Sequence, residues 1–143
     1  MTYLVDANVL SEATKPMPEP KILDWLRKNE REIVVNPIIL GEIRFGIERM
    51  PPGRRRQRFE AWFDEGVEKL TCLPFEAASG IRWAQLLAKL HAAGTQMPIQ
   101  DSLIAATALV HGLTVVTRNV RDFQKGRRDG GRPVHVIGCS SFR

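Results

Sequence analysis

Short apolar runs alternate along this chain with longer segments in which apolar residues recur every three or four positions. The short runs predict strands at 3–5, 33–35, 70–73, 113–117 and 134–137. Strands that alternate with helices in this way are typical of a parallel sheet wrapped by helices. We therefore expect an α/β fold with three layers, α/β/α, in which a short parallel central sheet is flanked by helices.

The helical periodicity and its breakers divide the rest of the chain. Pro37 is at the favoured first-turn position of a helix, and the sequence MPPG at 50–53 breaks that helix. The basic amphipathic segment that follows, ending near Lys69, completes a helical hairpin. Polar residues and glycines predict a loop at 125–133. The remaining helices are predicted at 21–28, at 76–92 and from 99 to Gly112.

The composition places the chain among ordinary folded proteins. It has 143 residues, of which 43% are hydrophobic, and this length suits a single domain spanning 1–143. No apolar run approaches the roughly 20 residues of a membrane span and no signal peptide is recognisable, so we expect a cytoplasmic protein without a membrane partner. Its two cysteines are far apart and lack zinc-ligand spacing, which predicts buried, reduced thiols.

Four acidic residues occupy positions where burial is expected. Asp6 follows the first strand and Asp122 comes shortly after the strand at 113–117, and open α/β sheets bind ligands at the carboxyl ends of their strands. Glu42 and Asp101 lie on predicted helices, and all their neighbours three and four positions away are apolar or glycine. An ordinary solvated acid would share a helix face with polar residues.

Each of these acids also has a purely structural interpretation. Asp6 is a good cap for a short following helix, and Asp101 stands in a first helical turn, where the helix dipole favours an anion. Glu42 can be a buried structural acid, although unpaired buried glutamates are rare. Asp122 can belong to a surface turn. The hypothesis of a shared site depends on the four acids converging.

Convergence would require positive charge. Two carboxylates about 4 Å apart repel by roughly 4 kcal/mol at an effective dielectric constant near 20. No basic residue lies three or four positions from Glu42 or Asp101, so a hard divalent cation is the simplest counter-charge, and Mg²⁺ or Mn²⁺ prefers oxygen ligands. With a net charge of +5, which favours partners rich in phosphate, the acids indicate metal-assisted phosphodiester hydrolysis.

Four segments in order resemble the motifs of the PIN-domain ribonucleases, in particular the VapC-type and FitB-like toxins of bacterial toxin–antitoxin pairs. The segments are LVDANVLSE, NPIILGEIRFGI, PIQDSLIAATAL and LTVVTRNVRDF, and the resemblance covers essentially the whole chain. It implies one three-layer PIN domain with a short parallel sheet.

Residue by residue, the resemblance makes Asp6, Glu42 and Asp101 the catalytic, metal-binding acids, with Asp122 as the fourth. Many family members have aspartate where this chain has Asn119. The fourth metal ligand is therefore either Asp122 or Asn119, which would contact the metal or a water bound to it. The remaining candidates for orienting the carboxylates by hydrogen bonds are Asn8, Ser11 and Thr117.

The resemblance further implies a toxin that cuts RNA, often structured RNA such as transfer RNA, with Mg²⁺ or Mn²⁺. It implies a homodimer and a cognate small antitoxin that lays an apolar segment near the hairpin of residues 37–69, and through the antitoxin a larger complex on operator DNA. Two basic stretches, 49–58 and 118–132, supply candidate RNA contacts. These are Arg54, Arg55, Arg56, Arg118 and Arg121.

Two other functions compete with this interpretation. One is a basic RNA-binding protein without catalysis, in which the acids hold a structural cation. The other is a phosphotransferase of the haloacid-dehalogenase type, with Asp6 as a covalent nucleophile, but that chemistry usually needs a second aspartate two residues on, where this chain has Asn8.

Overall fold

We describe a computed structural model of the chain, covering residues 1–125 and 134–143. The strands are β1 (Tyr3–Val5), β2 (Ile33–Val35), β3 (Thr71–Cys72), β4 (Thr114–Thr117) and β5 (His135–Gly138). The α-helices are α1 (Ala7–Leu10), α2 (Pro20–Lys28), α3 (Pro37–Glu48), α4 (Arg54–Glu65), α5 (Ala77–Ala92), α6 (Ile99–His111) and α7 (Val120–Gln124). Short 3₁₀ turns are η1 (Ser11–Thr14), η2 (Glu30–Glu32), η3 (Val67–Lys69) and η5 (Cys139–Ser141).

All the strand pairs in the described residues are parallel. The strand order is β3-β2-β1-β4-β5, so the first strand of the chain lies in the middle of the sheet. Tyr3 lies opposite Ile33 on one side and Thr114 on the other, which sets the register of the central strands. The chain winds outward from β1 through β2 to β3, and then restarts at β4 on the other side of β1.

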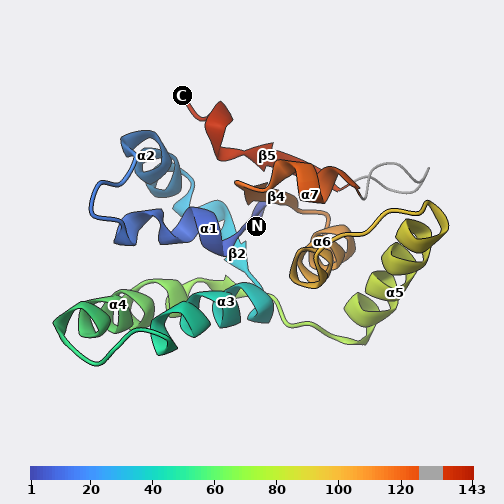
Figure 1. Cartoon of the computed structure of the whole chain (residues 1–143). Coiled ribbons are helices and arrows are strands. Elements are labelled where there is room, and N and C mark those ends of the chain that lie inside the picture. The colour runs from blue at the N-terminus through green and yellow to red at the C-terminus, as the bar shows by residue number, and fades with distance from the viewer. Residues whose placement is uncertain (126–133) are drawn as a thin grey trace.

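This change of direction determines which helices cover which face. Crossovers between parallel strands are almost always right-handed, so helices of the first half and of the second half pack on opposite faces. Figure 1 shows α1 and α2 on one side of the strands and α5 and α6 on the other, with the α3–α4 hairpin extending below α1. The switch point between β1 and β4 is where open α/β sheets of this kind bind ligands.

The core explains why the strands are continuous apolar runs. Both faces of the sheet are covered by helices, so side chains on both faces of the central strands are buried. Trp25 of α2 stacks on Phe142 with ring centroids 4.6 Å apart and meets Tyr3 edge-on at 5.0 Å. Fully buried strand residues include Leu4, Val5, Val35, Val115 and Val116.

The predicted elements agree with the structure to within a few residues. The helix after Pro37 ends at Glu48 rather than Met50, and the second helix of the hairpin ends at Glu65, followed by the short turn η3. Most of the predicted loop at 125–133 falls on residues 126–133, outside the described residues. No helix in the described part of the chain is long and apolar enough to cross a bilayer.

The prediction that both cysteines are buried is wrong for Cys72. Its side chain is exposed and Cys139 is only partly buried, and neither forms a disulfide. Cys72 belongs to β3, a two-residue strand at the edge of the sheet whose two residues are both exposed. An edge strand is covered on fewer sides than a central strand, so the apolar character of cysteine did not lead to burial there.

Candidate active site

Asp6 is held by two hydrogen bonds at the carboxyl end of β1. Its Oδ1 accepts from the Ala7 N–H at 2.8 Å as the N-cap of α1, and its Oδ2 accepts from the Thr117 hydroxyl at 2.7 Å. Burial raises the pKa of the Asp6 carboxyl, and the two hydrogen bonds partly offset that rise. The structural interpretation of Asp6 as a helix cap is therefore correct, and so is its predicted place at the carboxyl end of the first strand. The Thr117 hydroxyl orients its carboxylate.

A fully buried asparagine caps and positions the helix that carries Glu42. Asn36 follows β2 and caps α3 by accepting the Ile39 N–H at 2.9 Å. Its side-chain amide donates to the Thr107 hydroxyl in α6 at 2.9 Å. The Asn36 side chain thus ties α3 to α6, the two helices on which Glu42 and Asp101 lie, and this link was absent from our sequence prediction.

The negative charges of Asp6, Glu42 and Asp101 influence one another's ionisation. Burial raises the pKa of Glu42 to about 7, and the negative charges of Asp6 and Asp101 add to the effect. Burial likewise raises the pKa of Asp101 to about 6, with contributions from the charges of Asp6 and Asp122. The carboxylates of three segments that are far apart in sequence therefore lie near enough for their charges to act on one another.

Asp122 approaches this group from the first turn of α7. Its charge acts on Asp101, and one of its oxygens lies 3.4 Å from the Lys125 ammonium group. Asn119 precedes the same helix and donates its backbone N–H to the Thr117 hydroxyl at 3.0 Å. The segment after β4 is thus connected to the acidic group both through Asp122 and through the Thr117 hydroxyl that contacts Asp6.

The donor set suits a hard cation. It consists of carboxylate oxygens whose pKa values are raised first by burial and then by the negative charge of the neighbouring acids, and the Lys125 charge only partly compensates at Asp101. Within residues 1–125 and 134–143, no three Asp, Glu, His or Cys side chains form a ready-made metal cage. Carboxylate oxygens are nevertheless the ligands that Mg²⁺ prefers, and it typically takes one or two carboxylates and completes its shell with water and substrate phosphates.

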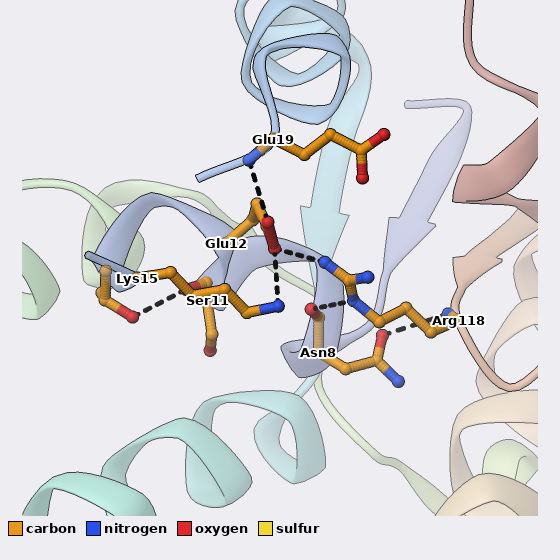
Figure 2. A network of polar contacts seen from close by, with 7 residues as sticks. Asn8, Ser11, Glu12, Lys15, Glu19 and Arg118 are labelled. Carbon is orange, nitrogen blue, oxygen red and sulfur yellow. Dashed lines mark hydrogen bonds and ion pairs between the residues drawn. The ribbon is translucent and has the colours of Figure 1, made fainter. Parts of the chain in front are cut away.

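Another buried acid, Glu12, was mentioned in no site prediction. Its carboxylate is 2% exposed and accepts from the Glu19 N–H at 3.1 Å, while Lys15 and Arg118 form ion pairs with it. Figure 2 shows these groups converging on Glu12, which lies within η1. Burial opposes ionisation of Glu12, but the hydrogen bonds and the two cations outweigh it and keep its pKa below the usual value.

The Glu12 network joins the first and last motifs of the site. Arg118 also donates its backbone N–H to the Asn8 side chain at 3.2 Å and its Nε to the Asn8 carbonyl at 3.1 Å. Arg118 immediately follows Thr117, so these contacts hold the start of the β4–α7 connection against α1. The sequence carries no clear signal for this network, because Glu12 lies among other polar residues and its partner Arg118 is 106 residues away.

The other predicted polar residues have different surroundings. Asn8 and Ser11 line a hollow of about 480 Å³ that also borders Glu42 and runs between α1, α3 and α4. Of the arginines, Arg56 is paired with Glu48 and Glu60, and Arg118 is paired with Glu12. The side chains of Arg54, Arg55 and Arg121 are exposed. Their roles toward RNA and metal stay predictions.

Comparison with known sequences gives one family and several relatives. Residues 3–128 match the family described as the PIN domain. The chain is similar to the VapC ribonuclease Y4jK of Sinorhizobium fredii, with 32% identity over 88% of this chain and 93% of that protein. It is 29% identical to the toxin FitB of Neisseria gonorrhoeae over 84% of this chain and 89% of that toxin.

Solved structures give the same result. The crystal structure of FitAcB from Neisseria gonorrhoeae has a TM-score of 0.87 at 26% identity, covering 99% of this chain and 100% of that one. The structure of FitAB bound to an IR36 DNA fragment has a TM-score of 0.88 at 25% identity, covering 99% and 98%. The predicted three-layer fold is confirmed by these similarities.

Proposed function

The chain belongs to the PIN-domain family, and from this premise we propose that it is a metal-dependent endoribonuclease acting as the toxin of a toxin–antitoxin pair. The observation that carries the proposal is the electrostatic coupling of Asp6, Glu42 and Asp101 at the switch point of the sheet. The similar proteins named as a VapC ribonuclease and as toxin FitB support the same activity. The proposal includes a single PIN domain that spans residues 1–143.

In this proposal Asp6, Glu42, Asp101 and Asp122 hold Mg²⁺ or Mn²⁺. The bound cation supplies an activated water and neutralises charge on the phosphodiester as it is cleaved. The hydrogen bond from Thr117 fixes the orientation of the Asp6 carboxylate and favours its ionised form. With a pKa of about 7, Glu42 carries a proton on part of the molecules at neutral pH, and that proton has to leave before the carboxylate can bind a cation.

The substrate in this proposal is structured RNA such as transfer RNA. The net charge of +5 and the exposed arginines at the hairpin support a phosphate-rich partner. The same reasoning supports the rival reading of a basic RNA-binding protein whose acids hold a cation for stability alone. A covalent phosphotransferase receives less support, because both Asp6 oxygens accept hydrogen bonds from the protein.

Two protein partners complete the proposal. A small antitoxin lays an apolar segment in the hollow beside Glu42, whose wall includes Ile43, Ile47 and Met50, and presents a basic side chain to the acids. A second copy of the chain covers the face where Phe45, 63% exposed, lines a hollow together with Glu42 and Leu103. The DNA-bound FitAB structure supports a larger complex on operator DNA, formed through the antitoxin.

The direct test is RNA cleavage by purified protein and by Asp101→Asn. A mixed pool of small RNAs that includes transfer RNA is incubated with Mg²⁺, Mn²⁺ or EDTA, after removal of any antitoxin. We expect cleavage with either metal, none in EDTA, and a loss of at least 100-fold in the variant, because Asp101 would hold the metal.

Thermal melting in the presence and absence of Mn²⁺ is measured beside it. If metal stabilises the protein while neither version cleaves any RNA, the non-catalytic reading is correct. Equal cleavage by both versions would mean that a contaminating nuclease is responsible.

A further inference from the structure

A second hollow lies on the molecule between η1 and helix α4, with a volume of about 420 Å³. Three basic side chains line it, Lys15 from the chain after η1 and Arg55 and Arg58 from α4. Two aromatic side chains, Phe59 and Trp62, line it as well. Positive charge and aromatic surface are the two features with which proteins bind single-stranded nucleic acid.

The arginines of α4 divide into two groups by their contacts. Arg56 is committed to the protein itself, because it pairs with Glu48 and Glu60 and donates to the Met50 carbonyl. Arg55 and Arg58 form no ion pair with any carboxylate in the described residues. The nearest acid to Lys15 is Glu12, whose charge is shared with Arg118. The hollow therefore carries positive charge that the protein leaves uncompensated.

Helix geometry places the cations and the rings together. Positions 55, 58 or 59, and 62 follow the i, i+3/i+4, i+7 spacing of a single helix face. The Arg55 guanidinium lies 5.5 Å from the centre of the Phe59 ring. Phe59 and Trp62 are only partly buried, so part of each ring is available to a ligand. This face of α4 combines a phosphate-binding group with a stacking surface.

This hollow continues into the candidate active site. Thr14, Arg55, Phe59 and Trp62 also line the hollow of about 480 Å³ whose wall includes Glu42. A chain lying along both hollows would pass from the cationic end to the acidic group. The acids alone would repel a polyanion, so a cationic anchor at one end gives the strand a favourable place to bind.

We propose that the hollow between η1 and α4 anchors the RNA strand, with its phosphates on Arg55 and Arg58 and one unstacked base against Phe59 and Trp62. The proposal rests on the proposed nuclease function and names the surface through which the substrate is held away from the cleavage point. It assigns RNA binding to Arg55 and Arg58 but not to Arg56, whose contacts are all within the protein.

The test is RNA binding in the Asp101→Asn background, where binding is measured without cleavage. A fluorescein-labelled single-stranded RNA decamer is titrated with the protein at several salt concentrations. Arg55→Ala/Arg58→Ala should weaken binding at least tenfold and lower the dependence of log Kd on log salt by about 1.4, as two lost phosphate contacts require. Phe59→Leu should weaken binding about fivefold with an unchanged salt dependence, because it removes the stacking surface and no charge.

A matched control removes the same charge at two exposed basic residues that line neither hollow. Lys21→Ala/Arg31→Ala should bind within about twofold to threefold of the parent at physiological salt, where long-range charge effects are screened. Melting curves confirm that each variant is folded. Equal binding by the two double variants would overturn the proposal, as would absence of RNA binding by the parent. So would normal RNA binding by Arg55→Ala/Arg58→Ala accompanied by loss of antitoxin binding.

RNA cleavage is measured separately, in proteins that retain Asp101. Selective loss of RNA binding in Arg55→Ala/Arg58→Ala, without cleavage by the active parent, would support the anchor and contradict the nuclease. Metal-dependent cleavage that is unaffected in the same double variant would support the nuclease and contradict the anchor.

Discussion

The two oxygens of Asp6 have different partners, and this difference matters for the chemistry. Oδ1 caps α1, whereas Oδ2 is held by the hydroxyl of Thr117, a fully buried residue of β4. A buried carboxylate near two other acids tends to protonate, and hydrogen bonds from protein donors oppose that tendency. Thr117 therefore helps to keep Asp6 both oriented and charged.

Replacing Thr117 by Val should weaken metal binding. Valine has the same shape but no donor, so the pKa of Asp6 should rise further and its carboxylate should lose its fixed orientation. We expect Mn²⁺ affinity, measured by isothermal titration, and the cleavage rate to fall about 10-fold to 100-fold. Thr114→Val in the same strand is the control and should leave both unchanged, since Thr114 makes no contact with the acids that the structure describes. An unaltered affinity in Thr117→Val would contradict this role.

Glu42 should make the metal-free protein less stable as the pH rises. Its pKa is about 7 in the folded protein against an ordinary value of 4.5, so the folded state binds the proton more tightly than the unfolded state. Stability from this group is present below pH 4.5 and is lost as the pH rises to about 7.

Glu42→Gln removes that dependence. In EDTA at pH 8, urea denaturation should find the variant more stable than the parent by about 1–2 kcal/mol, a figure discounted for the contact of Glu42 with water. At pH 4.5 the two proteins should differ much less. A difference that stays constant across this pH range would show that the charge of Glu42 is not the cause.

Helices α3 and α6 depend on Asn36 for their relative position. Its side chain caps α3 and bonds Thr107 of α6 from a fully buried position. Asn36→Ala should lower the free energy of unfolding by about 2–3 kcal/mol, since it removes a cap and leaves buried polar groups without partners.

Asn29→Ala is the comparison for Asn36→Ala. Asn29 is partly buried and donates its side-chain amide to the Trp25 carbonyl at the end of α2. Its loss should cost less than about 1 kcal/mol in the same urea experiment, because water can replace the bond at a partly exposed site. Similar costs for the two variants would mean that Asn36 does no more than cap a helix.

The sequence predicted the long helices and strands well because their signals are local. Pro37 begins α3 and Gly112, with φ of 65°, ends α6, as their residue types suggest. The apolar neighbours of Glu42 and Asp101 correctly marked these acids as unusual. The pairings of Asn36 with Thr107 and of Glu12 with Arg118 were not predictable, because each joins residues separated by 71 or more positions through a choice of side-chain direction.

The exposed apolar face beside Glu42 should control assembly of the molecule. Phe45→Glu places a charge at the proposed contact between two copies, so light scattering after gel filtration should show a dimer for the parent and a monomer for the variant. Met17→Glu, at a side chain that is 90% exposed elsewhere on the surface, should leave the dimer intact. A dimeric Phe45→Glu protein would place the interface on another face.

The central position of β1 also has a consequence for the order of folding during synthesis. Tyr3–Val5 is translated before the other strands of the sheet, yet β1 needs β4, from more than a hundred residues later, as its second neighbour. Pairings across such separations form late, because the intervening chain loses entropy on closing the loop. Asp6 and Thr117 meet only after that closure. A growing chain therefore lacks an assembled acidic site until β4 has been translated, so any activity of that site begins only after that point.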